Sequence, residues 1–334
     1  MTPCMWYLDL PSTDPFFNLA AEEHLFQALP RGQSLFMLWQ NDRAVVVGRY
    51  QDTIQEIDLQ FVRQHGIRVV RRLSGGGAVY HDLGNLNFTF ITDTPCQESI
   101  SFQPFCQPII DALAGLGISA SLSGRNDILI QGKKCSGNSQ YVRGSRVLHH
   151  GTLLFRSDLK TVAQALHVDR EKIHSKGIPS VSSRVTNICN YLPQPISLDE
   201  FKQSLVKSIS AKYPVTPYAI QEEDLSAIQA LQKEKYGTWD WNYGHSPQHQ
   251  ITRKARIEGC GTIEVSISLT QGSSIEDIQF FGDFFSPIGI DTLSNCLRGQ
   301  SYCRSSLQNI LSSISIEPLI RALTPERLLD LLIG

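Results

Sequence analysis

The sequence predicts an α+β protein of two domains, a large one over residues 1–246 and a small one over residues 249–334. Its length of 334 residues exceeds what a single domain usually contains. In the large part, short β-branched runs alternate with helical patterns, whereas the small part shows strands first and helices afterwards. Residues 239–247 interrupt both patterns with aromatic side chains and Pro247, so the predicted boundary follows them.

Apolar spacing and turn residues predict the first elements. A helix over 11–29 has Ser12 or Asp14 as its cap, because these side chains accept hydrogen bonds from the first free N–H groups. The runs 35–39 and 44–49, with a polar turn between them, predict a β-hairpin. A short helix and two strands are predicted to follow, over 53–65, 67–70 and 87–91.

Capping and proline positions set the helices in the middle of the chain. Residues 102–116 have a helical period, although Pro104 and Pro108 confine its regular part to about 108–116, because proline lacks the backbone donor. Ser197 and Glu200 have the spacing of a capping box at the start of another. The other predicted elements here are strands at 128–130, from 133 onward and at 147–155, helices over 158–168, 197–212 and 222–236, and a loop or irregular strand over 176–188.

The small domain has a simple predicted order. Three alternating strands precede three helices, over 252–257, 262–269, 275–281, 290–298, 304–313 and 325–333. The domain carries no glycine loop or cationic cluster. We therefore expect the primary chemistry to reside in the large domain.

The composition excludes several classes of protein. A net charge of −2 and a pI near 6.5 argue against nucleic acid or a membrane surface as the partner. No stretch of 18 apolar residues and no secretory leader pattern is present, so we expect neither a membrane span nor export. The eight cysteines form no C-x-x-C pair, which favours reduced thiols in the cytoplasm over a disulfide scaffold or a zinc site.

The segment 71–81, Arg-Arg-Leu-Ser-Gly-Gly-Gly-Ala-Val-Tyr-His, is the most informative of the chain. Three glycines can bring backbone N–H groups against an anion, because no Cβ blocks the approach and a positive φ costs little. Arg71 and Arg72 add donors for carboxylate or phosphate. This favours an anion-binding loop; the alternative is a flexible turn between strands, which a bare glycine triplet usually forms.

A second hairpin offers further polar groups. Neighbours on a strand point to opposite faces, so only one of Lys133 and Lys134 can enter a site. Asn126 and Asp127 suit a Mg²⁺–phosphate group, and Asp127 equally suits a turn cap. Both readings stay open.

Histidine and cysteine residues are weaker candidates for the functional site. His149 and His150 diverge as strand neighbours and have no evident third ligand, so we expect a core or substrate-facing His150 and no metal site. Cys135 beside a lysine suits an activated thiol, although a buried structural cysteine is the commoner case.

Several short motifs follow one another along the chain. They are Phe-Asn-Leu-Ala-x-Glu-Glu at 17–23, Arg-Arg-x-Ser-Gly-Gly-Gly-Ala-Val-Tyr-His-Asp-x-Gly-Asn-x-x-Phe-Thr-Phe at 71–90, Ser-Gly-Arg-Asn-Asp at 123–127, Lys-x-Ser-Gly-Asn-Ser at 134–139, His-His-Gly-Thr-Leu-Leu at 149–154, Lys-Gly-Ile-x-Ser-Val-x-Ser-Arg-Val-Thr-Asn at 176–187 and Trp-x-Trp-Asn at 239–242. Together they strongly resemble the lipoate–protein ligases of the bacterial two-domain type. Cys135 departs from the family, in which an aliphatic residue is expected.

The resemblance implies a fold and a reaction. The large domain would have the mixed sheets of the biotin/lipoate ligase type, and the small α+β domain would be the C-terminal accessory domain. The enzyme would use Mg²⁺ and ATP to convert lipoate into lipoyl-AMP and pyrophosphate. It would then transfer the lipoyl group to one lysine of an apo lipoyl domain, in the E2 subunit of a 2-oxoacid dehydrogenase or in the glycine cleavage H protein.

The resemblance also implies roles for individual residues. Lys134 would be the catalytic cation between the lipoate carboxyl group and the α-phosphate. ATP and lipoyl-AMP would contact Arg72, Ser74, Gly75, Gly76, Gly77, Ala78, Val79, Tyr80, Asn126, Asp127 and Lys134. Lipoate would contact Lys134, His81 and His150, and Asp127 would hold Mg²⁺.

Two other functions remain as alternatives. One is an ATP-independent lipoyl or octanoyl transferase of the same superfamily, which needs a nucleophilic cysteine, and none lies between Cys135 and Cys189. The other is a non-catalytic protein that binds lipoyl carriers; Arg72, Lys134 and the glycine triplet argue against it.

Overall fold

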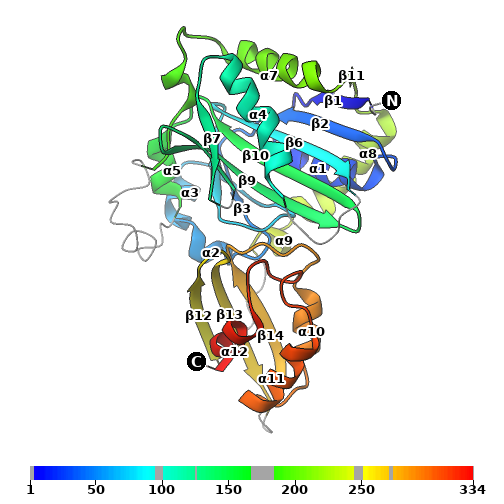
Figure 1. Ribbon diagram of the computed structural model, residues 1–334, viewed down its shortest axis with the longest axis vertical. Coiled ribbons are helices and arrows are strands. Elements are labelled where there is room, and N and C mark those ends of the chain that lie inside the picture. Colours follow the sequence, from blue (N-terminus) through cyan, green and yellow to red (C-terminus); the bar gives the residue numbers. More distant parts are fainter. Residues whose placement is uncertain are drawn as a thin grey trace.

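The computed structural model describes residues 4–94, 101–124, 126–166, 184–243, 251–270 and 274–333. Figure 1 shows a large part built on sheets and helices, and below it a smaller part that contains strands β12 to β14 and helices α10 to α12. The α+β class predicted from the sequence is confirmed. The boundary between 246 and 249 lies outside the described residues and stays a prediction.

One eight-stranded mixed sheet forms the centre of the large domain. Its order is β11-β1-β2-β6-β10-β9-β8-β7, with β1 parallel to both of its neighbours and the other pairs antiparallel. The strands are β1 (Met5–Asp9), β2 (Ser34–Trp39), β6 (Asn85–Asp93), β7 (Ala120–Ser123), β8 (Asp127–Ile130), β9 (Lys133–Arg143), β10 (Arg146–Leu154) and β11 (Val215–Pro217).

A second, three-stranded sheet carries the glycine loop. Its order is β4-β3-β5, with β3 (Ala44–Val47) between β4 (Arg68–Arg71) and β5 (Val79–His81). The predicted hairpin of residues 35–39 and 44–49 is therefore wrong, because β2 and β3 lie in different sheets. Two apolar runs joined by a short turn have the same local pattern in both cases, and only partners distant in sequence separate them.

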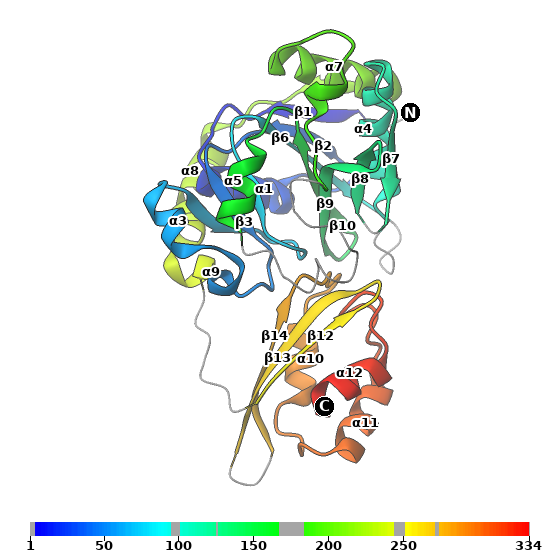
Figure 2. The same ribbon diagram turned by 90° about the vertical axis from the view of Figure 1, so that its left-hand side faces the viewer.

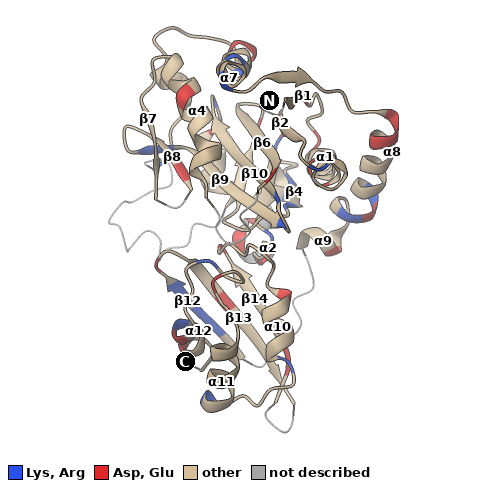
Figure 3. Ribbon diagram, turned by 45° about the vertical axis from the view of Figure 1, so that its right-hand side comes forward, with Lys and Arg blue, Asp and Glu red and all other residues tan. Residues whose placement is uncertain are grey.

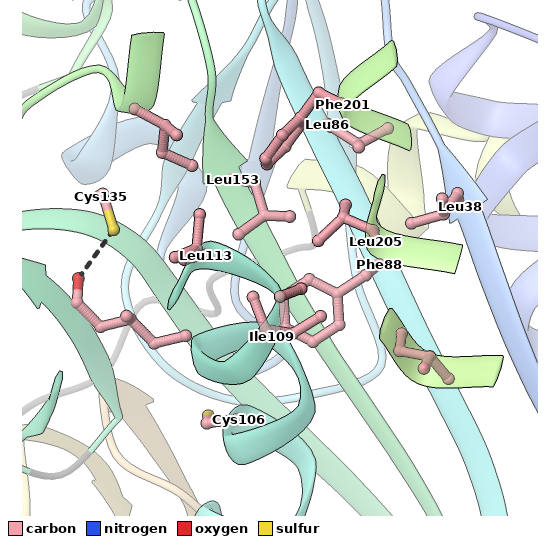
Figure 4. Close-up of a cluster of buried hydrophobic side chains, with 14 of the residues drawn as sticks. Leu38, Leu86, Phe88, Cys106, Ile109, Leu113, Cys135, Leu153, Phe201 and Leu205 are labelled. Carbon is pink, nitrogen blue, oxygen red and sulfur yellow. Dashed lines mark hydrogen bonds between the residues drawn. The ribbon is translucent and has the colours of Figure 1, made fainter. Parts of the chain in front are cut away.

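Helices cover both faces of the large sheet, so β2 is buried on both sides. Phe36 and Leu38 face the cluster formed with α4 (Gln103–Gly115) and α7 (Leu198–Lys212), part of which Figure 4 shows. Leu35 and Met37 face α1 (Pro15–Ala28) and α8 (Glu222–Leu231) instead. A strand apolar on both faces explains why its sequence shows a continuous run and no alternation.

Shorter helices complete the large domain. They are α2 (Thr53–Glu56), α3 (Leu59–Gln64), α5 (Leu159–Ala165), the 3₁₀ turn η2 (Ile188–Tyr191), the π-helical turn η3 (Gln232–Tyr236) and α9 (Trp239–Tyr243).

The predicted capping box of Ser197 and Glu200 is confirmed. The helical period predicted over 102–116 is confirmed, but the confinement of its regular part to about 108–116 is wrong, because α4 begins at Gln103 and contains Pro108. A proline in the first turn lacks only a donor that has no partner there, so Pro104 does not prevent this start.

The small domain agrees with its predicted order. Three antiparallel strands, β12 (Ile251–Ile257), β13 (Gly261–Leu269) and β14 (Ile275–Gly282), form one sheet, and Figure 2 shows it below the large domain. Helices α10 (Asp291–Leu297), α11 (Arg304–Ser313) and α12 (Pro325–Ile333) share its apolar core. Figure 3 shows that both domains carry basic and acidic segments side by side.

Among the described residues, no helix combines the length and the apolar character that crossing a bilayer requires.

Candidate active site

Arg71 holds the base of the glycine loop in place. Its guanidinium donates to the carbonyl oxygens of Gly48, Arg49 and Gln51 at 2.7–3.1 Å and to Thr53 Oγ1 at 2.7 Å. It also donates to the carbonyls of residues 241 and 242, so it joins β4 to α9. The sequence prediction that Arg71 supplies an anion donor is therefore wrong, because its side chain binds backbone carbonyls inside the protein.

Arg72 shapes the loop itself. Its guanidinium donates to the carbonyls of Gly75 and Gly77 at 2.7 and 2.9 Å, and to Val46 O and Ser74 Oγ at 3.1 Å. Burial lowers its pKa to about 10, so the group remains charged at neutral pH. Arg72 lines the cavity described below, where it places a buried positive charge beside the loop.

The three glycines have different structural roles. Gly76 has a φ of +91°, in the left-handed region that favours glycine. A Cβ on Gly75 would lie 2.3 Å from the carbonyl oxygen of Phe284, which belongs to the small domain and also accepts the Gly76 N–H at 3.2 Å. Gly77 has neither a positive φ nor an atom within 4 Å of a Cβ, so the protein itself does not require glycine at this position.

The Gly76→Ala variant therefore tests the loop. The strained φ and the 3.1 Å approach of the new Cβ to Arg72 Nη2 should lower stability by about 1–3 kcal/mol and redirect the loop N–H groups. We expect the apparent KM for ATP in pyrophosphate release to rise at least tenfold, on the order of 1.4 kcal/mol. Gly115→Ala on α4 is the control, since Gly115 is exposed, has no positive φ and does not line the cavity, and its Cβ meets open space. An equal or larger rise in the Gly115 variant would contradict this account.

A hydrogen-bonded chain connects the loop to α1. Glu22 accepts from His150 Nδ1 at 3.0 Å, which leaves His150 Nε2 to accept the Ser74 hydroxyl proton at 2.6 Å. This arrangement resembles a nucleophile with its base and orienting carboxylate. Ser74 is only 1% exposed, however, and does not line the cavity. We conclude that the chain positions the loop.

A cavity of about 130 Å³ lies between the glycine loop and the large sheet. The sequence-predicted residues that line it are Arg72, Gly76, Gly77, Ala78, Val79, His81, Asn126, Lys134 and His150. Its further lining residues are Leu19, Trp39, Val46, Asn87, Gly137, Asn138, Ser139, Gly151 and Thr152. Tyr80 does not line it, because its side chain packs with Val45 and Val47 on the other face of its sheet.

Lys134 brings a second cation to this cavity. Its Nζ pairs with Asp127 Oδ1 at 2.7 Å, and a Cβ on Gly137 would lie 2.7 Å from the same nitrogen. Gly137 therefore leaves the space that the ammonium group occupies. Lys133 is exposed, in agreement with the expectation that only one of the two lysines enters the site.

The predicted metal residues have other partners. Asp127 binds Lys134, and Asn126 donates to the carbonyl oxygen of Asn138 at 2.6 Å. Among the described residues, no three His, Cys, Asp or Glu side chains gather as a metal site. Mg²⁺ is commonly held by one carboxylate together with substrate phosphates, so Asp127 fits that role only with a nucleotide present.

Two buried groups are structural. Burial raises the pKa of Cys135 to about 12, and its thiol donates to Ile128 O at 3.4 Å, so it is not an activated nucleophile. His149 is enclosed by Phe105, Phe102 and Phe88, and burial lowers its pKa well below the usual value. The expectation that His149 and His150 diverge is confirmed.

Sequence reasoning missed several residues of the site. Glu22 carried no separate signal in an apolar helix, and Gly48 has ordinary dihedral angles, yet a Cβ there would lie 1.9 Å from Gly76 O. Phe284 and Phe285 lie in the small domain, and Phe285 packs against Phe102 of the large domain at 5.5 Å between ring centroids. Contacts between domains have no local pattern in the sequence.

The chain matches one class of protein along most of its length. A family model described as the lipoyl protein ligase A/B catalytic domain matches residues 14–210, and one described as the bacterial lipoate protein ligase C-terminus matches residues 246–332. The chain is 41% identical over 322 residues to the lipoate–protein ligase LplJ of Bacillus subtilis, covering 96% of this chain and 97% of that protein. It is 42% identical to lipoate–protein ligase 1 of Staphylococcus aureus, with 91% of each covered. The chain belongs to the lipoate–protein ligase family.

Solved structures agree with this assignment. A crystal structure of lipoate–protein ligase A bound with ATP has a TM-score of 0.64 at 27% identity, and covers 73% of this chain and 99% of that one. A bipartite lipoate–protein ligase of Thermoplasma acidophilum, described with its E2 lipoyl domain, has a TM-score of 0.64 at 28% identity, covering 75% and 100%. Plasmodium falciparum LipL1 in complex with lipoate shares the fold at a TM-score of 0.80 and 23% identity, covering 98% of both chains.

Proposed function

We propose that this ligase activates lipoate with ATP and transfers the lipoyl group to a lysine of an apo lipoyl domain. The observation that carries the proposal is the cavity that Lys134, the glycine loop and Arg72 line together. Relatives that cover most of the chain are named lipoate–protein ligases, and a related structure contains ATP. The E2 lipoyl domain of the archaeal relative supports lipoyl domains as acceptors, and the H protein is proposed as a second acceptor.

The first half-reaction brings two anions together. A lipoate carboxylate oxygen attacks the α-phosphorus of ATP, the bond to the β-phosphate oxygen breaks, and pyrophosphate leaves. Fixed cations and oriented N–H groups must offset the repulsion between the two anions. Lys134 and Arg72 supply buried or half-buried positive charge here, and residues 77–79 of the loop line the cavity as candidate backbone donors. Mg²⁺, proposed at Asp127, would neutralise phosphate charge.

The second half-reaction needs no further cofactor. The neutral amine of the acceptor lysine attacks the carbonyl carbon of lipoyl-AMP, and an amide bond forms. The bond between the acyl carbon and the phosphate oxygen breaks, AMP leaves, and the proton lost by the amine passes to the phosphate of AMP or to solvent. Lys134 and the loop would hold the phosphate of the departing AMP. Because the acceptor is a whole protein domain, the cavity mouth must be accessible at this step.

One experiment tests the proposal directly. Apo lipoyl domain or apo H protein is incubated with the enzyme, lipoate, ATP and Mg²⁺, and the mass of the acceptor is measured. We expect one lipoyl group on one lysine, together with pyrophosphate release that requires ATP. A mass increase without ATP would indicate a transferase, and tight acceptor binding without a mass increase would indicate a non-catalytic binder.

The transferase alternative is not favoured. It requires an accessible, activated cysteine. Cys135 and Cys106 are both buried, and burial raises the pKa of each thiol to about 12.

Removal of the small domain should affect the two half-reactions unequally. In the described structure, Phe284 and Phe285 cover the glycine loop, so the small domain is placed to exclude water during activation. We expect a chain ending near residue 246 to retain transfer from preformed lipoyl-AMP better than it retains adenylate synthesis. The two rates are measured side by side in the truncated and full chains. Loss of transfer with normal activation would make the small domain an acceptor-docking module.

A further inference from the structure

His81 is a buried polar residue in the cavity wall with one nitrogen unused. It is 3% exposed, lies at the end of β5 and lines the cavity. Its Nε2 has no hydrogen-bond partner within the part of the chain that the structure describes. A buried polar atom without a partner costs free energy, and the His81 ring lines the cavity, so a ligand bound there is the candidate partner of Nε2.

The protonation of His81 follows from a fixed chain of amides. Asn18 Nδ2 lies 3.0 and 2.7 Å from the carbonyl oxygens of Ser12 and Gln40, which can only accept. The same Nδ2 donates to Asn41 Oδ1 at 2.9 Å, so Asn41 presents its own Nδ2 to His81 Nδ1 at 3.1 Å. His81 Nδ1 must therefore accept, and its ring proton resides on Nε2.

A second amide and the local charge support this tautomer. Asn85 donates to Asn87 Oδ1 at 2.9 Å, which turns Asn87 Nδ2 toward the same His81 Nδ1, 3.5 Å away. Burial, followed by the charges of Arg72 and His150, lowers the pKa of His81 to about 3. The ring is neutral at pH 7, with Nε2–H as its single donor.

The sheet register places His81 at the end of the cavity away from Lys134. Lys134 Nζ lies over Gly137 on β9, and Gly137 N–H donates to Thr152 Oγ1 on β10 at 3.1 Å. Thr152 pairs with Asn87 on β6, and Asn87 pairs with Trp39 on β2. The His81 ring lies edge-on to Trp39 at 6.3 Å. Strands lie about 4.8 Å apart, so β9 and β2 are separated by roughly 14 Å.

We propose that the Nε2–H of His81 is a specificity determinant, which donates to a sulfur atom at the far end of the bound acyl chain. This proposal rests on the proposed function, in which the carboxyl end of the chain meets Lys134. A sulfur-bearing acid such as lipoate gives the buried donor a weak acceptor. Octanoate has the same carbon chain without sulfur and leaves the N–H unpaired, so the cavity discriminates against it.

Binding calorimetry tests this without requiring catalysis. Dissociation constants for lipoate and octanoate are measured in the wild type, in His81→Phe, which keeps a planar ring without the donor, and in His81→Gln, which restores an N–H. We expect the preference of the wild type for lipoate to fall roughly five- to tenfold in His81→Phe, because lipoate loses a partner and octanoate no longer buries an unpaired donor. His81→Gln should keep more of the preference than His81→Phe. Circular dichroism confirms that each variant is folded.

The outcomes separate the two proposals. Equal lipoate preference in the wild type and His81→Phe would overturn the inference, and so would an equal loss in both variants, which would indicate an effect of shape alone. Absence of pyrophosphate release in a wild type that still prefers lipoate would overturn the proposed function and leave the role of His81 standing.

Discussion

Replacement of Lys134 by alanine is expected to abolish adenylate formation while the fold stays intact. The variant removes the ammonium group that lies over Gly137, on a residue that lines the same cavity as the glycine loop. Loss of one preorganised cationic donor should cost roughly 3–4 kcal/mol of transition-state stabilisation, on the order of a hundredfold or more in rate. Lipoate-dependent exchange of pyrophosphate into ATP measures this step alone, and the thermal unfolding midpoint reports the fold.

Lys133 provides the matched control for that variant. It is the strand neighbour of Lys134 and is exposed to solvent, so Lys133→Ala should leave exchange nearly unchanged. Near-normal exchange in Lys134→Ala, or equal losses in the two variants, would remove Lys134 from the catalytic role.

Replacement of Arg71 by alanine is expected to destabilise the protein more than any surface change. Its guanidinium satisfies five carbonyl oxygens and one hydroxyl in the interior, and burial already lowers its pKa to about 10. Removal takes this donor from all of them, and among the described residues only Asn242 O and Gly48 O keep another, from Thr53 Oγ1 and the Gln51 N–H. The free energy of unfolding should fall by roughly 3–5 kcal/mol. Urea denaturation measures the change.

Arg31 supplies the comparison. Its side chain is 70% exposed and pairs with Asp93 at 3.1 Å, so Arg31→Ala should cost less than about 1 kcal/mol. If the Arg71 variant were no less stable than the Arg31 variant, the internal contacts of Arg71 would have to be compensated elsewhere.

Much of the fold could be predicted from local patterns. The order of the small domain and the capping box of α7 depend on residues within a few positions of one another. The assignment of β2 and β3 to different sheets does not depend on neighbouring residues. It is decided by their partners β6 and β4, which follow later in the chain. β1 and β11 were missed for a related reason, since each is short and pairs in parallel with distant strands.

The candidate site was likewise predictable only where local patterns determine it. The glycine loop was predicted from its composition. Strand alternation admitted only one of Lys133 and Lys134 to the site, and the family resemblance implied that it is Lys134. The direction of Arg71 was mispredicted, because a donor-rich side chain binds ligand anions and internal carbonyls equally well, and only the course of residues 48–53 and α9 decides between them. The tautomer of His81 depends on an amide that is 40 residues away in the sequence, so no local pattern could reveal it.

The contacts of Arg71 with α9 also fix the point at which the chain leaves the large domain. Arg71 N–H donates to Asn242 Oδ1 at 2.9 Å, and Trp241 Nε1 donates to Arg71 O at 2.9 Å. Seven residues, 244–250, separate Tyr243 from the first residue of β12. A chain of that length spans at most roughly 26–29 Å. Ile251, where the small domain begins, therefore lies within that distance of α9 in any arrangement of the two domains. The hydrogen bonds of Arg71 fix α9 to β4, the strand that leads into the glycine loop.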